Sequence, residues 1–511
     1  MTAEIQAPAE TQFSSISQIA GGELKTLARH SSHYLAGLLG NLALGLVSFP
    51  IFTRLFSVAE YGLMDLAQRV VLMLTIASKA GLQNAVLRFY DKDQFGRNPE
   101  SARTYYSTML LGTFSIAVCV GMGFIAVSSI LPESVWSGPL AKLTYVIAGL
   151  AMLRALGAIV WGFLRIEERT KAFNAVTVGT RGATIAAVCA LLPWAGRTAR
   201  TYLIGSVVVE TVLIATLTLW LMRRNLLAVS RVDGGMFRAG IVFGLPLVVY
   251  ELAFAVLGSA DRFLVRSYLG ADALGFYSVA YGIAQHANEI LVAPLGLAIL
   301  PIYMRLWASQ GSEKTSEFLT IALDFFVMGA AGILAMVGAA ASPLIILLAS
   351  SKYAGGDHLI PLILGGLLIY ATYIFVAAGL LIHKRTAEMA GLLVFAAVIN
   401  IGLNCLMLPR LGLTGSAVAT LLSYALCIFL LGRSSNRFLH LRFSGRSLMK
   451  YAAAAAAAWI VGTQVELGAP VLNLLGKGGT ALSCYVAALY TVDGRVRHAA
   501  RWVAVQCKGQ I

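Results

Sequence analysis

Four basic side chains stand inside long apolar stretches of this 511-residue sequence, and they are its first candidates for chemistry. They are Arg69, Lys79, Arg154 and Arg181. A charged side chain in a membrane-like environment is costly unless it faces other protein groups or water. In a water-filled cavity an arginine offers paired donors and a lysine a point charge, so such residues could bind a diphosphate group. We therefore predict these four cations as candidate ligands of an anionic substrate.

Two of these positions also have a simpler interpretation. Asp65 precedes Arg69 by four residues, the spacing at which two side chains on one helix form an ion pair. Lys79 could extend along its aliphatic stem to the cytoplasmic edge of a membrane rather than into a cavity. The ligand role and the structural role both stay open for each residue.

Acidic side chains in other apolar stretches are candidates for binding a coupling ion, because a buried carboxylate can take up and release a proton. Glu251 leads, since Pro246, five residues earlier, removes one helical hydrogen bond and allows a kink. The alternative for Glu251 is a static ion pair with an arginine of a facing helix. His286 and Glu289 are one helical turn apart and could form a proton relay, although a packing contact is the simpler explanation. Asp324 completes the set of ion-coupling candidates.

The sequence contains no recognisable catalytic motif. GxSxG, HExxH and P-loop patterns are absent, and the glycine-rich stretches lack the strand–turn–helix context of a nucleotide site. The six cysteines show neither the spacing of a metal site nor a disulfide framework. We therefore predict no enzymatic activity, no cofactor and no metal.

The elements that must position these side chains are membrane-spanning helices. Hydrophobic residues make up 58% of the chain and charged residues 12%, against about 45–50% and about 25% in a soluble domain. The mean hydropathy is +0.77. Apolar blocks of about 20 residues, the length of one span, recur along the whole sequence. We predict about fourteen spans, centred on Gly40, Leu74, Ala117, Leu150, Ala186, Val212, Glu251, Ile290, Leu334, Ile369, Ala396, Ser423, Ala456 and Ala481.

The predicted fold is an all-α integral membrane protein with two parallel six-helix bundles and a central cavity. The first bundle covers 31–225 and the second 236–433, and a C-terminal helix pair covers 447–492. Residues 1–30 and 493–511 are predicted cytoplasmic tails. No cleavable signal peptide is expected, because the N-terminal stretch has no apolar core.

Basic residues indicate the orientation of the chain. Most of the 39 lysines and arginines fall in alternate loops, the asymmetry that marks cytoplasmic loops, and this favours both termini in the cytoplasm. A net charge of +15 would suggest nucleic-acid binding in a soluble protein. Here the basic residues lie in short breaks between spans, where they meet anionic headgroups. We therefore predict membrane lipids as partners and no nucleic acid.

An internal repeat relates the two predicted bundles. The segment RLFSVAEYG (54–62) recurs about 213 residues later as RSYLGADALG (266–275), and internal repeats are typical of transporters. Each copy lies between the first and second predicted span of its half. An even number of spans separates the copies, so the repeat predicts two halves related by an axis along the membrane normal.

Three segments resemble a known family. The stretch from Tyr34 to Tyr90, with RLFSVAEYGLMDLA and GLQNAVLRFY, resembles the N-terminal signature of polysaccharide flippases for O-antigen and exopolysaccharide. SADRFLVRSYLGADALGFYSVAY (Ser259–Tyr281) is similar to that family's second copy of this region, and LGLTGSAVATLLSYAL (Leu411–Leu426) to its twelfth span. These flippases belong to the multidrug/oligosaccharidyl-lipid/polysaccharide exporter superfamily.

The resemblance implies alternating access between two bundles in the inner membrane of a bacterium. The implied cargo is a polyprenyl-diphosphate-linked oligosaccharide, moved to the periplasmic leaflet for surface polysaccharide biosynthesis. Arg69, Arg154 and Arg181 fit the cationic cavity of such a protein by type and approximate depth. A polysaccharide polymerase and chain-length machinery are implied partners, and the extra helix pair resembles the lipid-tail groove of the lipid II flippase.

Three other functions stay open on the sequence alone. They are a cation-coupled multidrug exporter, a lipid II flippase, and a membrane polysaccharide polymerase or ligase. An enzyme of the last kind would be expected to carry catalytic residues on a sizeable outward loop. The longest outward breaks here are about 10–15 residues, near the ordinary length of a connection. The sequence therefore favours transport over catalysis.

Overall fold

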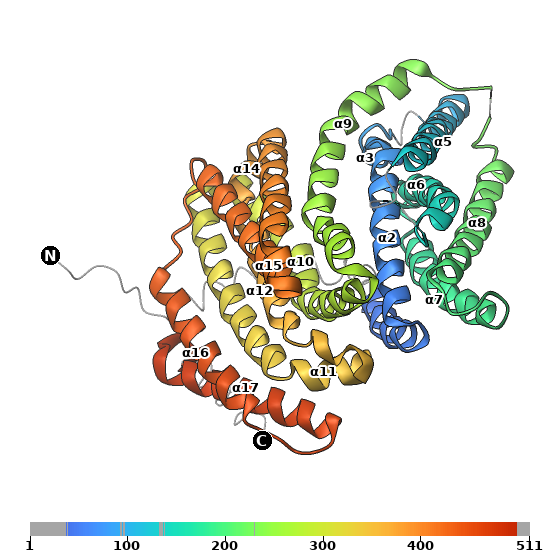
Figure 1. Ribbon diagram of the computed structural model, residues 1–511. Coiled ribbons are helices and arrows are strands. Elements are labelled where there is room, and N and C mark those ends of the chain that lie inside the picture. Colours follow the sequence, from blue (N-terminus) through green and yellow to red (C-terminus); the bar gives the residue numbers. More distant parts are fainter. Residues whose placement is uncertain are drawn as a thin grey trace, which may run out of the picture. The chain divides into compact units, whose positions relative to one another are not determined.

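The computed structural model is helical throughout, and no strand occurs in the residues that it describes (Figure 1). These residues are 37, 39–91, 95, 98–131, 136, 138–228 and 230–497. The predicted tail over 1–30, and residues 498–511 of the second predicted tail, lie outside them. The predicted all-α class is confirmed.

The helices follow one another along the chain with short connections. They are Leu39–Leu55, α2 (Val58–Lys79), α3 (Leu82–Arg88), α5 (Pro99–Ile130), η1 (Ala141–Leu143), α6 (Thr144–Ile166), α7 (Thr170–Ala195), α8 (Ala199–Arg223), α9 (Gly234–Leu257), α10 (Ala260–Ala339), α11 (Ala341–Leu348), η2 (Ser351–Gly356), α12 (Leu359–Ala371), α13 (Tyr373–Val376), α14 (Ala378–Ile382), α15 (Thr386–Ser435), α16 (Gly445–Thr463) and α17 (Pro470–Val492).

Contacts along the chain define two compact units. The larger unit holds Ala36–Gly282 and Lys384–Cys427, and the smaller unit holds Ile283–His383 and the stretch that follows Ile428. Both long helices, α10 and α15, contribute residues to each unit. The parallel pair of bundles over 31–225 and 236–433 stays a prediction.

Seven helical stretches of the described chain are long and apolar enough to cross a membrane, or eight if the bent pair α2–α3 is one span. The stretch Gly234–Ala339 alone covers 106 residues. A helix rises about 1.5 Å per residue and the apolar core of a membrane is about 30 Å thick, so this stretch contains several crossings. Within it α9 ends at Leu257 and α10 begins at Ala260, and inside α10 Gly270 and Gly311 have positive φ angles of 89° and 78°. The helices α16 and α17 are not among the seven, and the number fourteen stays a prediction.

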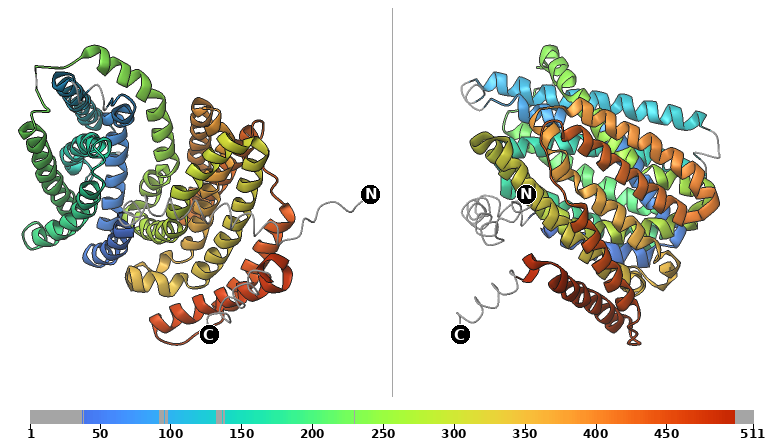
Figure 2. Two further views of the ribbon diagram at one scale, coloured as in Figure 1. Left: turned by 180° about the vertical axis from the view of Figure 1, so that it is seen from behind. Right: turned by 90° about the vertical axis from the view of Figure 1, so that its left-hand side faces the viewer.

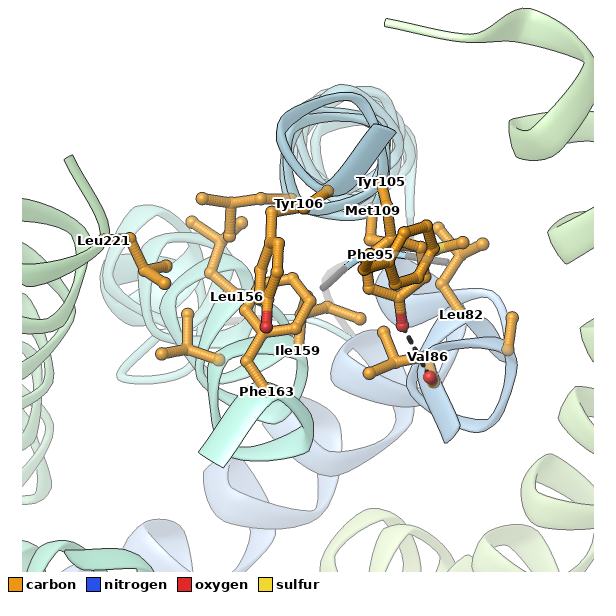
Figure 3. Close-up of a cluster of buried hydrophobic side chains, with 14 of the residues drawn as sticks. Leu82, Val86, Phe95, Tyr105, Tyr106, Met109, Leu156, Ile159, Phe163 and Leu221 are labelled. Atoms are coloured by element: carbon orange, nitrogen blue, oxygen red, sulfur yellow. Dashed lines mark hydrogen bonds between the residues drawn. The ribbon is translucent and has the colours of Figure 1, made fainter. Parts of the chain in front are cut away.

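Aromatic and aliphatic side chains from α3, α5, α6 and α8, together with Phe95, form a buried cluster in the larger unit (Figure 3). The ring of Tyr106 meets Phe163 with centroids 4.5 Å apart. The buried hydroxyl of Tyr105 donates to the carbonyl oxygen of Val86 at 2.5 Å, so it also has a polar partner. Because lipid is as apolar as these side chains, close packing and interhelical hydrogen bonds hold such helices together.

The second predicted span is broken between α2 and α3, which meet at an angle of 47°. Ala80 and Gly81 both have positive φ angles, 44° and 76°, and this ends α2. A side chain on Gly81 would place its Cβ 2.4 Å from the Cα of Gly244 on α9, so only glycine fits there. The break therefore brings the backbone of α9 against the end of α2.

In the smaller unit, α16 and α17 lie side by side (Figures 1 and 2). The pair packs on α10, where the hydroxyl of Tyr485 donates to the carbonyl oxygen of Met328 at 2.6 Å. Gly462 allows the approach, because a Cβ there would lie 2.8 Å from the Cβ atoms of Ala339 and Ala481. The pair occupies the region predicted for the extra helices, 447–492.

Candidate functional site

Five polar side chains lie on one side of α2, among the apolar side chains of Leu72 and Ile76; we call this side the polar face. At about 100° per residue, Asp65, Gln68, Arg69, Thr75 and Lys79 fall within an arc of about 120°. Figure 1 shows α2 beside α6 and α9, and helices of the larger unit supply partners for this face. A polar face on an apolar helix must meet protein groups or water. The face carries two of the four predicted cations.

Lys79, just before the break in the second span, forms an ion pair with Glu251 of α9. The Nζ of Lys79 lies 2.7 Å from the Oε2 of Glu251 on α9. Gln83 on α3 donates from its Nε2 to the other carboxylate oxygen at 3.0 Å. The structure thus joins a predicted ligand and a predicted ion-coupling acid, and the partner of Glu251 is a lysine rather than an arginine. Their side chains are 16% and 29% exposed, so the pair is only partly shielded from its surroundings.

Arg154 connects α6 to α2 and α8. Its Nη1 donates to the Oε1 of Gln68 at 2.7 Å, and its Nε lies 3.7 Å from the carboxylate of Glu210. The side chain of Glu210 is 8% exposed and that of Arg154 is 29% exposed. The buried acid therefore balances a guanidinium that keeps part of its surface accessible.

Asp65 is shared by two arginines. Its Oδ1 lies 3.2 Å from the Nη2 of Arg69, the predicted pair on one helix, and its Oδ2 accepts from the Nε of Arg262 at 2.7 Å. Arg262 also lies 3.2 Å from the carboxylate of Asp261. We refer to Asp65, Arg69, Asp261 and Arg262 as the Arg262 cluster.

Neutral side chains complete the Arg262 cluster. The Oδ2 of Asp261 accepts from the hydroxyl of Tyr277 at 2.6 Å and from that of Thr420 on α15 at 3.2 Å. Thr420 continues into buried polar contacts with Asn400, which also donates to Ser423 at 3.2 Å. The cluster therefore links α2, α10 and α15 within the larger unit.

Arg181 has a different kind of partner. Its Nη1 donates to the carbonyl oxygen of Asn41 at 3.0 Å, and its side chain is exposed. No carboxylate lies within ion-pair distance of it among the residues that the structure describes. Within the described part of the chain, Arg181 thus lacks the acidic neighbour that Arg69, Lys79 and Arg154 each have.

The other ion-coupling candidates belong to the smaller unit. The Nδ1 of His286 lies 3.7 Å from the Oε2 of Glu289, and Gln285 donates to the Oε1 of Glu289 at 2.8 Å. The one-turn spacing therefore does bring this histidine and this acid together. The pair lies on α10, on the segment that also contains Pro294 and Pro301.

Asp324 belongs to a cluster that joins α10 to the C-terminal helices. Its Oδ2 accepts from the hydroxyl of Tyr451 at 2.9 Å and from the Nη1 of Arg495 at 2.6 Å. Arg495 also lies 3.0 Å from Asp493. Burial would raise the pKa of the Asp493 carboxyl, but hydrogen bonds and charge from Arg495 outweigh burial and hold this pKa below its usual 3.8. These four residues form what we call the Asp324 cluster.

Asp261 and Arg262 were not predicted as site residues from the sequence, although they lie in the segment Ser259–Tyr281 that carries the family resemblance. They are adjacent residues of opposite charge at the edge of an apolar block. A charged pair next to an apolar block was the available signal. In the described part of the chain, no group of three or more His, Cys, Asp or Glu could hold a metal ion.

Comparison with known proteins decides the family. A model of the polysaccharide biosynthesis protein family matches residues 27–307, more than half of the chain. The chain belongs to this family. It is also similar to the succinoglycan biosynthesis transport protein ExoT of Rhizobium meliloti, with 23% identity over 343 residues. That match covers 65% of this chain and 64% of the relative, so the chain spans slightly less than two thirds of the relative's length.

Solved structures agree on the fold. The lipid II flippase MurJ in an inward closed conformation matches with a TM-score of 0.63 and 14% identity, over 90% of this chain and 98% of that one. An inward-facing multidrug resistance MATE family transporter of the MOP superfamily matches with a TM-score of 0.63 and 14% identity, over 78% and 94% of the two chains. These two matches show that the chain shares the fold of these transporters. The chain is a multi-pass membrane protein of the polysaccharide biosynthesis family.

Proposed function

We propose that this protein moves polyprenyl-diphosphate-linked oligosaccharide repeat units across the bacterial inner membrane by alternating access. The proposed product is a surface polysaccharide, and both termini are proposed to lie in the cytoplasm. A polysaccharide polymerase and chain-length machinery would take over the delivered units. Membership of the polysaccharide biosynthesis family supports the class of cargo.

The observation that carries the proposal is the polar face of α2 together with Arg154 of α6, which donates to Gln68 on that face. Arg69 and Arg154 keep 23% and 29% of their side chains exposed while carboxylates balance their charge. Guanidinium groups form paired hydrogen bonds with phosphate oxygens. A face of this kind supports transient binding of a diphosphate, since each arginine can exchange its internal partner for the substrate.

Arg181 is the most direct test of this binding role. A cation without an acidic neighbour is tolerated in a span only where it reaches water or a ligand. We propose that Arg181 meets the anionic part of the cargo in a water-filled cavity. The Arg181→Ala variant is then expected to lower export at least about tenfold, equivalent to about 1.4 kcal/mol of lost binding.

Deleting the gene and measuring two pools tests the function. Surface polysaccharide should fall, while completed lipid-linked repeat units accumulate in the cytoplasmic leaflet. Arg181→Ala should reproduce this phenotype with an unchanged melting temperature. Arg223→Ala, which removes an exposed arginine at the end of α8, serves as the matched control and should export normally. Unchanged polysaccharide in the deletion strain would exclude the proposal.

For ion coupling we propose Glu251 first. It lies beside both a helix break and Pro246, so a change in its charge would act where the backbone already departs from a regular helix. His286 and Glu289 are the second candidates. The partners of Asp324 favour attachment of the C-terminal helices as its role.

A cation-coupled multidrug exporter is the second candidate function, because the MATE transporter matches with the same TM-score as MurJ. It predicts new sensitivity to cationic dyes in the deletion strain with polysaccharide intact. A lipid II flippase would instead make depletion cause lysis. The two pool measurements and a dye-sensitivity assay separate all three outcomes.

A further inference from the structure

Arg262 is a fully buried cation in the larger unit, with 0% of its side chain exposed. Its Nε donates to Asp65 at 2.7 Å and its Nη1 to the carbonyl oxygen of Gly258 at 2.9 Å. The Cζ lies 3.9 Å from the centre of the Tyr281 ring, a cation–π distance. These contacts hold the guanidinium in one place, and none of its surface can meet a substrate directly.

The charges of the Arg262 cluster balance, since two carboxylates face two guanidinium groups. The two arginines, however, do not hold Asp65 equally. Arg262 holds Asp65 by the shorter contact, 2.7 Å against 3.2 Å for Arg69. Each arginine has one nitrogen without a hydrogen-bond partner among the described residues, Nε in Arg69 and Nη2 in Arg262, but the side chain of Arg69 is the most exposed of the four.

We propose that Arg262 is a positioning residue for Arg69. By neutralising Asp65, it leaves the guanidinium of Arg69 weakly held and available to a diphosphate group, while Asp65 keeps that guanidinium in place between transport cycles. The inference rests on the proposed function, because it names Arg69 as a contact of the lipid-linked diphosphate.

Without Arg262 the cluster would carry one excess negative charge. Asp65 could then offer both carboxylate oxygens to Arg69 and form a bidentate ion pair, which is a strong interaction. The same excess charge would repel an approaching diphosphate. Removing Asp65 as well would restore the balance, since only Arg69 and Asp261 would remain charged.

Equilibrium binding of polyprenyl diphosphate to the purified full-length protein in detergent tests the inference. Arg262→Gln is expected to weaken binding at least about tenfold. The Asp65→Asn/Arg262→Gln double variant is expected to recover to within about threefold of the wild type. If Arg262 only held α10 against α2, the double variant should bind no better than Arg262→Gln, because it lacks both partners of the Asp65–Arg262 ion pair. Failure of the double variant to recover would therefore overturn the inference.

Two further variants keep the test decisive if Arg262→Gln does not fold. Asp65→Asn alone is expected to bind polyprenyl diphosphate several-fold more tightly, because it releases Arg69 and leaves Arg262 paired with Asp261. Weaker binding by Asp65→Asn would contradict the inference. Arg69→Gln should lose binding, because it removes the guanidinium that the inference assigns to the diphosphate, and unchanged binding would also contradict the inference.

The outcome also separates this inference from the proposed function. Wild-type protein that does not bind polyprenyl diphosphate would count against the proposed function itself. Wild-type protein that binds, together with an Arg262→Gln variant of equal affinity, would count against the positioning role alone.

Discussion

At the scale of single residues, the charged groups on the polar face of α2 occur in balanced sets. Lys79 faces Glu251, and Asp65 faces two arginines. A single charge left in a span is far more costly than a paired one, so each charge on this face has a partner of opposite sign. Pairing explains why the face is compatible with a membrane, and partial exposure leaves these side chains accessible to the ligand that we propose.

The Lys79–Glu251 pair gives a prediction for stability. Lys79→Met and Glu251→Gln should each lower the free energy of unfolding by about 1–3 kcal/mol, because each leaves one charge unpaired. The double variant should recover much of this loss, since it leaves neither charge. Thermal unfolding in detergent measures all three. Additive losses in the double variant would mean that the two side chains do not depend on each other.

At the scale of elements, the break between α2 and α3 depends on the close approach of α9. Gly81 combines a φ of 76° with contact to the backbone of Gly244. A regular helix through this point would carry Gln83 away from its present place, and the contact with Glu251 depends on that place. The local backbone therefore sets the geometry of the ion pair.

Gly81→Ala should destabilise the protein by about 2–4 kcal/mol, the sum of a strained left-handed residue and an overpacked contact. Gly179→Ala on α7 is the matched control, because nothing lies within 4 Å of its Cβ position. That control should be neutral or slightly stabilising, since alanine is the better helix former. Equal melting temperatures for the two variants would show that the approach of α9 is not tight.

The Asp324 cluster attaches α16 and α17 to α10 and gives another prediction for an element. Arg495→Ala should cost about 1–3 kcal/mol, because Asp324 is only 11% exposed and would lose its cation. The C-terminal helices should then become more sensitive to proteases at the connection before α16. Arg446→Ala, at an exposed position of α16, is the control and should leave proteolysis unchanged.

The effect of Arg495→Ala should not vary with pH from about 6 to 8. A carboxyl whose pKa is lowered on folding contributes its full stabilisation above its unfolded value and loses it only as the pH falls through the lowered value. For Asp493 the unfolded value is 3.8. A loss of the Arg495 contribution between pH 6 and 8 would mean that another titrating group controls the cluster.

At the scale of the whole molecule, the internal repeat leads to a direct contact between its own copies. Gly62 and Gly275 occupy equivalent positions in the two copies, and a Cβ on Gly62 would lie 2.6 Å from the backbone nitrogen of Gly275. A residue that meets its own equivalent lies close to the axis relating two similar parts. This contact is what a pair of halves related by such an axis would produce.

Gly62→Ala should therefore disturb both halves at once, lowering the free energy of unfolding by about 1–3 kcal/mol and reducing export. Gly275→Ala should also destabilise the protein, because its Cβ would overlap the carbonyl oxygen of Val58 at the start of α2. Gly149→Ala has nothing within 4 Å of its Cβ position and should export normally. Normal export by Gly62→Ala would mean that the contact is not needed during transport.

The sequence alone determined the helical membrane class, the family and the cations placed within spans. These properties are local, because about 20 consecutive apolar residues specify a span and a charge within them stands out at once. Only the tertiary structure decided which charges meet. Asp65 and Arg262 are 197 positions apart, and Gln83 and Glu251 are 168 apart. No local pattern encodes such a pairing, since it depends on how helices pack and on a break that glycine permits at a single point. For this reason Arg69 and Lys79 could be found from the sequence, whereas the residue that controls Arg69 could not.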